Sequence, residues 1–343
     1  MKMNKLSRRV VLLGVLVLAA LPGVVFGQLF GGVNRLAPEE VAELRERAIA
    51  AVRAASASEN PALRMNAIEA SHAVPGLSSE LVGPLLLDEV VPVRFAALVT
   101  VGQLKLEEHA LAASDLAIDP DPSVRMAAIF AASENGVEID RSPLARLVRS
   151  PEPGVRGNAA LILGMMDDPT AAEMLREAAS VPYDRRVVVV QREIVKLQFA
   201  EALVKLGDDE ALGPIRAAAY SQSDEIRVFA VGMLGPLEDR RMIKLLIAML
   251  EQPPVELQLA AARSLLQMDV PDGLPIVLRA LDSAIPTVRA QAAYALGDSD
   301  DMVSLVGLSE ALSDESALVR LSAAAGVLRR LPTEASVEAV AQR

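Results

Sequence analysis

The sequence of 343 residues contains no cysteine and no tryptophan, and it has few large rings. Without cysteine the chain forms no disulfide, thiolate nucleophile, iron–sulfur cluster or thiolate zinc site. Aromatic residues make up only 3%, although hydrophobic residues make up 52%. A core this poor in rings must be built from Ala, Leu and Val. Such a core suits closely packed helices and argues against a β-sandwich or β-barrel.

Motifs that carry chemistry are equally scarce. Histidine occurs twice, as His72 and His109, and neither is accompanied by a Gly-x-Ser-x-Gly elbow. There is no Gly-Lys-Ser/Thr sequence of the Walker type, and the acidic clusters lack the twelve-residue alternation of a calcium loop. We therefore expect no catalytic residue, no metal site and no cofactor.

Residues 1–27 have the pattern of an export signal. A basic segment with Arg8 and Arg9 precedes an uncharged apolar run, Val10–Leu21, which is short for a membrane span. Cleavage before Gln28 fits the small residues that precede it. Ser7-Arg8-Arg9 also resembles a twin-arginine signal, so both the general and the twin-arginine routes stay open. We expect a periplasmic or extracellular protein, or a membrane-anchored one if the signal is uncleaved.

The charge narrows the choice of partner. Removal of residues 1–27 leaves 30 basic and 45 acidic residues, a net formal charge of −15. A field of this sign repels nucleic acids and anionic lipids and attracts basic proteins. Acidity also serves solubility alone. We expect a protein or peptide partner, with a basic one as a possibility, no nucleic acid, and no stable membrane insertion after cleavage of the signal.

A repeat of about 31 residues is the main feature of the chain. The recurring pattern is Val-Arg-x-x-Ala-Ala-x-Ala-Leu after a turn. We number each copy from the residue at the arginine position of this pattern, which we call the anchor. Seven of the eight intervals between anchors are 30 or 31 residues, and the eighth is 40. The nine anchors are Arg64, Arg94, Arg125, Arg156, Lys196, Arg227, Gln258, Arg289 and Arg320.

Each copy has helical spacing. A small residue stands at anchor position +3 in eight copies, and Leu is frequent at +7, so offsets 0, +3, +4 and +7 form one apolar face. Proline after a polar residue marks the start of this helix, as in Asp121-Pro122. A second helix fills the stretch before each turn. The pattern predicts an all-α, right-handed α-α superhelix of about nine helical pairs, because stacked pairs bury a face that one pair cannot.

The anchors are expected to be structural. Position −6 carries a hydroxyl or a carboxylate in seven of nine copies, which can satisfy free backbone N–H groups or reach an anchor arginine. We predict that this set forms a ladder along the turns: Arg94, Arg125, Arg156, Arg227, Arg289 and Arg320 with Asp88, Asp119 and Asp314.

The unit resembles the HEAT repeat, in the short form of phycobilisome lyase-like proteins. The resemblance rests on Asp119–Ala128, Val195–Gly207 and Ile285–Gly297 and covers about residues 57–331. It implies the solenoid fold and says little of function, because the matching residues are structural. Deoxyhypusine hydroxylases, which share this repeat, bind iron through His-Glu pairs. Here Ala73 and Ala110 follow the two histidines, which excludes that site.

The regular copies define the organisation of the chain. Residues 1–27 are a signal peptide and residues 28–36 a flexible leader. Residues 37–56 form an N-terminal capping helix, and residues 57–332 the solenoid. Residues 333–343 form a C-terminal capping helix. The long interval places an insertion at 181–190, where Tyr183, Arg185 and Arg186 are candidate contacts of a protruding loop or a lengthened helix.

A second candidate surface comes from offsets +1 and +5 of three consecutive copies. If these offsets face the inner side of the solenoid, they form an exposed apolar row of Phe95, Val99, Met126, Phe130 and Leu161. The alternative is that the apolar face is wide because each helix packs against two neighbours.

These observations favour an exported, non-enzymatic scaffold that binds a protein or peptide along its concave face. Two alternatives stay open: a lyase-like enzyme accessory or chaperone that acts on a modified protein, and a structural spacer of the cell envelope.

Overall fold

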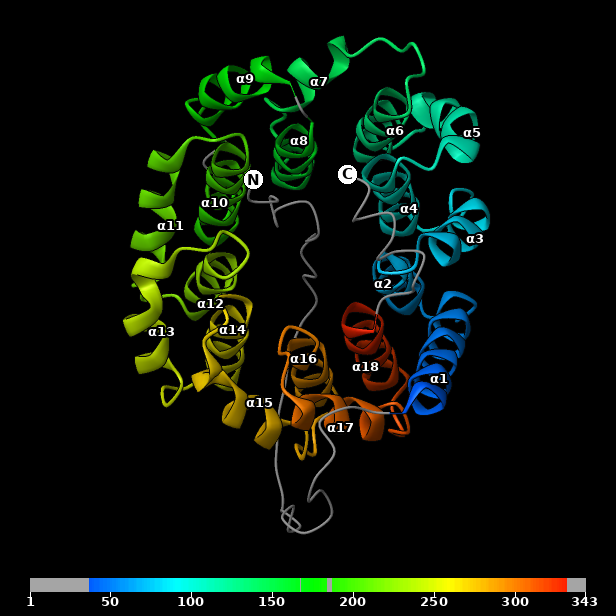
Figure 1. The fold of residues 1–343 in the computed structure, drawn as a ribbon. Helices are drawn as coiled ribbons and strands as arrows, with labels where there is room; N and C mark the ends of the chain where they lie inside the picture. The colour runs from blue at the N-terminus through cyan, green and yellow to red at the C-terminus, as the bar shows by residue number, and fades with distance from the viewer. Residues whose placement is uncertain (1–36, 167, 184–186, 332–343) are drawn as a thin grey trace, which may run out of the picture. The chain divides into compact units, whose positions relative to one another are not determined.

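The computed structural model describes residues 37–166, 168–183 and 187–331. The proposed signal peptide, the leader, Arg185, Arg186 and the proposed C-terminal helix lie outside these residues. Throughout the described part the chain is helical and contains no strand (Figure 1). The predicted all-α class is confirmed.

Nine helical pairs follow one another in the described residues. We call the helix that contains the anchor the B helix and the helix before it the A helix. The B helices are α2 (Pro61–Ser71), α4 (Val91–Leu104), α6 (Pro122–Glu134), α8 (Pro153–Met165), α10 (Val189–Lys205), α12 (Asp224–Leu234), α14 (Val255–Gln267), α16 (Pro286–Leu296) and α18 (Ala317–Arg330). The A helices are α1 (Pro38–Ser56), α3 (Pro75–Leu85), α5 (Ala110–Asp115), α7 (Ser142–Leu147), α9 (Pro169–Ala179), α11 (Leu212–Ala218), α13 (Ile243–Met249), α15 (Leu274–Ala280) and α17 (Met302–Ala311). Short 3₁₀ turns at Glu107–His109, Leu116–Ile118, Asp209–Ala211, Arg240–Met242 and Pro271–Gly273 extend some of the A helices.

Proline and capping residues explain where the B helices begin. Eight of the nine start three residues before their anchor. The proline in the first turn has no N–H to leave unpaired, and a side chain at the preceding residue can cap the helix. Asp121 caps α6 in this way, since its Oδ1 accepts a hydrogen bond from the N–H of Ser123 at 2.7 Å. The exception is α10, which begins seven residues before Lys196, so part of the insertion lengthens a helix.

The helices form two compact units. Unit 1 runs from Val82 to Met242 among the described residues. In it the B helices α4, α6, α8, α10 and α12 pack in sequence, each against the next. Unit 2 combines the described residues up to Leu81 with those from Ile243 onward, and its B helices α14, α16, α18 and α2 pack in that order.

The first described helix packs against the last described one. In unit 2, α1 contacts both α18 and α2, and its buried face consists of Leu44, Ala48, Val52 and Ala55. The Nη2 of Arg47 donates a hydrogen bond to the carbonyl oxygen of Ser309 at 3.2 Å. The sequence predicts a capping helix at residues 37–56. Instead α1 is the A helix of the first pair, and the last pair of the chain adjoins it.

Small residues let the B helices approach one another. The alanine at position +3 is at most 1% exposed in all eight copies that have it. The remaining copy, whose anchor is Lys196, has Phe199 there, which is also buried. Glycine serves the same purpose on α8, where a Cβ on Gly164 would lie 2.7 Å from the Cβ of Ala202 on α10. The core therefore depends on close backbone packing more than on large side chains.

The proposed exposed row is wrong as a free surface. Phe130 is 1% exposed, Met126 is fully buried and Val99 is 3% exposed, whereas Phe95 and Leu161 are half-buried. The ring of Phe130 packs against α4, where a Cβ on Gly102 would lie 2.4 Å from Cε1. The reason is that α6, which carries Met126 and Phe130, packs against the B helices α4 and α8 and against the A helices α5 and α7, so its apolar face is wide.

The buried ring gives the first prediction. Substitution of Phe130 by Ala should lower the free energy of unfolding by about 3–5 kcal/mol, because it leaves a cavity against Gly102. Urea unfolding followed by circular dichroism measures this. Phe95→Ala is the matched control and should lower the free energy less, since Phe95 is half-buried. Equal losses for the two variants would contradict the assignment of Phe130 to the core.

Candidate functional site

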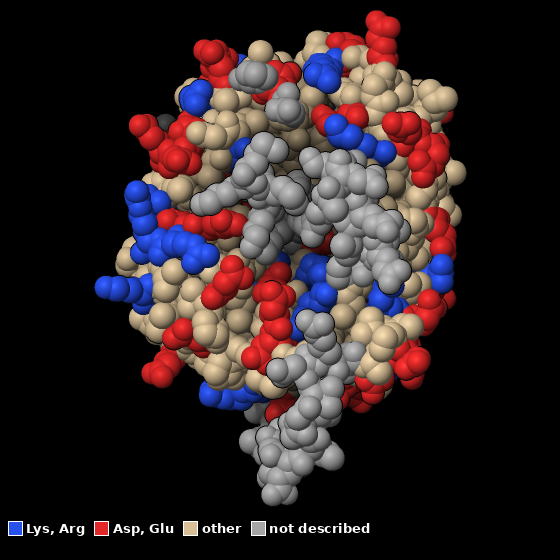
Figure 2. All heavy atoms as spheres, in the orientation of Figure 1, with Lys and Arg blue, Asp and Glu red and all other residues tan. Residues whose placement is uncertain are grey.

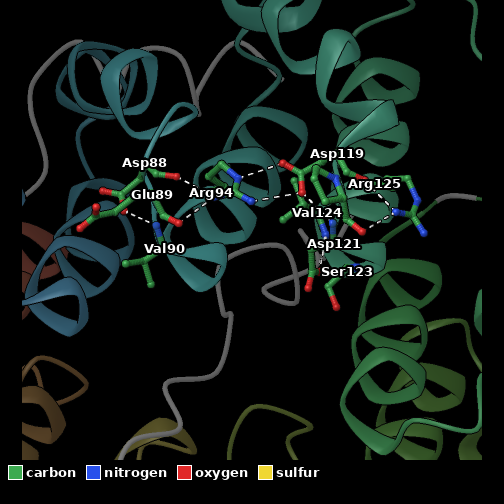
Figure 3. A network of polar contacts seen from close by, with 10 residues as sticks. Asp88, Glu89, Val90, Arg94, Asp119, Asp121, Ser123, Val124 and Arg125 are labelled. Atoms are coloured by element: carbon green, nitrogen blue, oxygen red, sulfur yellow. Dashed lines mark hydrogen bonds and ion pairs between the residues drawn. The ribbon is translucent and has the colours of Figure 1, made fainter.

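Two of the anchor arginines, Arg94 and Arg289, connect neighbouring turns between A and B helices. Arg94 donates from Nη1 to the carbonyl oxygen of Asp88 at 2.7 Å, in its own turn. Its Nε and Nη2 donate to both carboxylate oxygens of Asp119, in the next turn, at 3.0 and 3.1 Å. Figure 3 shows Arg94 between these two turns. The pair is largely buried, with side chains 14% and 6% exposed.

The aspartate at position −6 has two functions. Besides binding the arginine of the preceding copy, Asp119 accepts a hydrogen bond from the N–H of Asp121 at 2.8 Å. Serine at −6 can perform only the second function: Ser150 accepts from the N–H of Glu152 at 3.2 Å. Only an aspartate therefore connects two turns through a bidentate ion pair.

The same arrangement recurs at the far end of the chain. Arg289 donates to the carbonyl oxygen of Ser283 at 2.8 Å and to both carboxylate oxygens of Asp314, at 2.8 and 3.0 Å. Arg125 donates to the carbonyl oxygens of Asp119 and Pro120 in its own turn, at 2.7 and 2.9 Å. Arg320 does the same with Asp314 and Glu315, at 2.7 and 2.9 Å. Arg227 instead pairs with Asp224 on its own helix.

Arg156 departs from the ladder because the insertion follows it. The residue is 1% exposed, and its Nη2 donates to the carbonyl oxygens of Ala178 and, at 2.7 Å, of Val181. Its guanidinium carbon lies 4.1 Å from the ring centroid of Tyr183 and 5.7 Å from that of Phe199. Burial lowers the pKa of Arg156. Tyr183, a proposed partner contact, therefore covers a buried cation in this structure.

A polar cluster in unit 2 is the feature that sequence reasoning missed. The ring of Tyr294 on α16 lies beneath two guanidinium groups, with Arg263 of α14 at 4.5 Å and Arg329 of α18 at 4.2 Å from its centroid. The Tyr294 hydroxyl donates to Oε1 of Glu69 on α2 at 2.9 Å. Asp298 accepts from Nε of Arg263 at 3.0 Å. We call these five residues the Tyr294 cluster.

Repeat numbering shows why the cluster forms. Glu69, Arg263 and Tyr294 all occupy offset +5, the column that carries Val99 and Phe130 in unit 1. Helix α18, which lies between α16 and α2, has a buried alanine at this offset, and its small size leaves room for the tyrosine to reach Glu69. The signal was present in the sequence, but only a comparison of offset +5 over all nine copies finds it.

Burial changes the acidity of the cluster. It raises the pKa of Glu69 to about 7, against opposing effects of the Tyr294 hydrogen bond and the two arginines. Burial, together with the charge of Glu69, raises the pKa of Tyr294 to about 12. Burial also lowers the pKa of the His72 imidazole, at the end of α2, to about 4. Glu69 is thus the group of this cluster that titrates near neutral pH.

The geometry of the cluster suits structural work. Each arginine stacks on the tyrosine ring, and Nη2 of Arg329 also donates to the Tyr294 carbonyl oxygen at 2.6 Å. The phenol keeps its proton at neutral pH and directs it at a carboxylate. In this way side chains from α2, α14, α16 and α18 hold the first and the last described helical pairs together within unit 2.

Among residues 37–331, where described, no group of three or more His, Asp or Glu side chains is placed to hold a metal ion. Within the same part of the chain no helix combines the length and the apolar character needed to cross a bilayer.

Large apolar side chains are exposed mainly in unit 1. The exposed set in this unit is Leu87, Leu111, Ile118, Val188, Val189 and Tyr220, against Ile247 and Val303 in unit 2. Acidic side chains lie over the visible surface of both units, with basic ones among them (Figure 2). Several of the exposed apolar residues lie at turns and helix ends.

Comparison with known proteins identifies the repeat. Residues 110–191 and 243–329 match the family model of HEAT repeats, so the chain contains HEAT repeats, as the anchor spacing predicts. No curated protein matches the chain at the significance required.

The following three proteins are among the solved structures to which the chain is similar. Human deoxyhypusine hydroxylase in complex with glycerol is 17% identical, with 86% of this chain and 99% of that chain covered and a TM-score of 0.36. The complex of CpcE and CpcF of phycocyanin lyase from Nostoc sp. PCC7120 is 18% identical, with 90% and 100% covered and a TM-score of 0.34. The karyopherin Kap121p bound to the extreme C-terminus of the protein phosphatase Cdc14p is 14% identical, with 84% and 37% covered and a TM-score of 0.33.

The ladder generates a prediction for Asp119. Substitution by Asn should lower the free energy of unfolding by about 2–4 kcal/mol, because Arg94 then stays largely buried without a counter-charge. A double-mutant cycle with Arg94→Met, measured by urea unfolding, isolates the coupling. We expect the double variant to lose less free energy of unfolding than the two single variants lose in sum. Strict additivity would contradict the ion pair.

The Tyr294 cluster generates a prediction for pH. The folded chain holds the Glu69 proton more tightly than the unfolded chain, whose carboxyl titrates near 4.5. The stabilisation that protonated Glu69 contributes is therefore complete below pH 4.5 and is lost as the pH rises through about 7. Between pH 5 and pH 8 the free energy of unfolding should fall by about 2–3 kcal/mol more in the wild type than in Glu69→Gln. Identical pH profiles for the two proteins would contradict the raised pKa.

Proposed function

We propose that the chain is an exported, non-enzymatic HEAT-repeat scaffold that binds a protein or peptide. HEAT repeats over residues 110–191 and 243–329 support this. The large apolar side chains that unit 1 leaves exposed support it as well, because they offer apolar surface to a partner. The charged and polar side chains that recur in the repeat are engaged within the fold, in the turns and in the Tyr294 cluster.

Charge supports the choice of a basic partner. After loss of the basic signal segment, the formal charge of −15 steers cationic surfaces toward the protein and keeps polyanions away. The apolar run with its preceding arginines supports export, and the small residues before Gln28 support cleavage there.

Export is tested with the N-terminal segment. Residues 1–36 fused to a reporter should carry it out of the cytoplasm, and the mature N-terminus, read by mass spectrometry, should be Gln28. Arg8→Lys together with Arg9→Lys keeps the charge and removes the arginine pair. Unchanged export of this variant assigns the general route, and lost export assigns the twin-arginine route. A reporter that stays in the cytoplasm with the native segment refutes export.

Binding is tested on the mature protein. A chemical crosslink to one defined protein in the exported fraction, reproduced with purified components, is the expected result. A turnover of an added substrate that is lost in Tyr294→Phe or Glu69→Gln would instead favour the enzymatic alternative.

A further inference from the structure

One position of the repeat separates the two units. Position −7, the residue before the aspartate or serine of the ladder, is exposed in every copy except at Arg149, which is half-buried. In unit 2 it is occupied by Ala57, Glu251, Asp282 and Ser313. In unit 1 it is occupied by Leu87, Ile118, Arg149, Val189 and Tyr220. A position that is small or polar in one half of the repeats is thus mainly large and apolar in the other.

The first two of these residues lie on adjoining turns. Leu87 is 81% exposed and Ile118 is 89% exposed. Each directly precedes a residue that Arg94 binds, the Asp88 carbonyl in one turn and the Asp119 carboxylate in the next. Arg94 therefore joins the two turns that carry these side chains. Helices of neighbouring repeats pack about 10 Å apart. We call this pair the turn row.

The surroundings of the turn row are acidic. Over residues 87–94 and 115–125 the chain has five acidic residues, Asp88, Glu89, Asp115, Asp119 and Asp121, and two basic ones, Arg94 and Arg125, a net of −3. Glu89 and Asp115 are exposed beside the row. An apolar pair with this charge around it is complementary to a segment that is apolar and basic.

The width of the row selects an extended ligand. Each turn offers a single apolar side chain with acidic neighbours close by in the chain, and this is narrower than the apolar stripe that an amphipathic helix buries. In the polyproline II conformation an extended chain advances about 3.1 Å per residue and has three residues per turn. Every third side chain therefore points the same way and lies about 9 Å farther along, close to the spacing of packed helices.

We propose that the turn row of unit 1 binds an extended basic segment of a partner protein, with apolar side chains three residues apart and Lys or Arg between them. The proposal rests on the scaffold function proposed above and names the site and the class of its ligand. Tyr220, 63% exposed at the same position farther along unit 1, is available to a longer segment.

The test uses the mature protein and a fluorescent peptide of four Leu-Lys-Ser triplets. Fluorescence anisotropy should show binding that Leu87→Ser and Ile118→Ser each weaken by about tenfold. Leu111→Ser is the matched control, because Leu111 is a leucine 73% exposed at the start of α5 and outside the turn row. It should leave the affinity unchanged, and a Leu-Glu-Ser peptide should not bind.

Other results overturn the proposal. Equal affinity in Leu87→Ser, Ile118→Ser and the wild type removes the turn row as the site. Preference for a helical peptide with leucines seven residues apart removes the extended ligand. A dimer in sedimentation equilibrium that both substitutions dissociate makes the row a contact between two copies of this chain. In each case a partner crosslinked to the mature protein still upholds the scaffold function, whereas loss of that partner with intact peptide binding refutes the scaffold alone.

Discussion

Close approach between neighbouring B helices is the constraint on which the rest of this structure depends. It is met by alanine at position +3 in eight copies, and it explains a composition rich in small apolar residues and poor in rings. The copy anchored at Lys196 is the exception, because it has Phe199 at this position. At that point the chain has its insertion, a lengthened α10 and a buried arginine beneath two rings. These departures belong together, because a ring at +3 occupies the space that an alanine would leave free.

The turns solve a second problem, the unpaired backbone groups at the helix ends. Serine or aspartate at position −6 satisfies an N–H of its own turn, and the anchor arginine satisfies two carbonyls. At Asp119 and Asp314 the same carboxylate also binds the arginine of the copy before it. Part of the acidity of the protein is therefore built into its turns, and this acidity also shapes the surface that a partner meets.

The sequence predicted what depends on neighbouring residues. Helix starts follow from proline and its capping residue, so the start of α6 at Pro122 could be placed from Asp121 alone. The contacts of Arg94 and Asp119 follow from a fixed offset between successive copies. The orientation of offset +5 could not be derived in the same way, because periodicity identifies an apolar face but not how many neighbours cover it. Phe130 was misplaced for this reason. The Tyr294 cluster was missed because its hydrogen bond joins residues 225 positions apart.

The contact of α1 with α18 changes how this chain can fold. In an open repeat array each copy touches only its neighbours in sequence, and a protein can grow from one end. In unit 2 the first pair completes its core only when the last pair has been synthesised, so its contacts span nearly the whole chain. Such high contact order slows folding. Deletion of the last pair therefore uncovers the beginning of the protein as well as its end, whereas a circular permutant that joins the two ends keeps both pairs together.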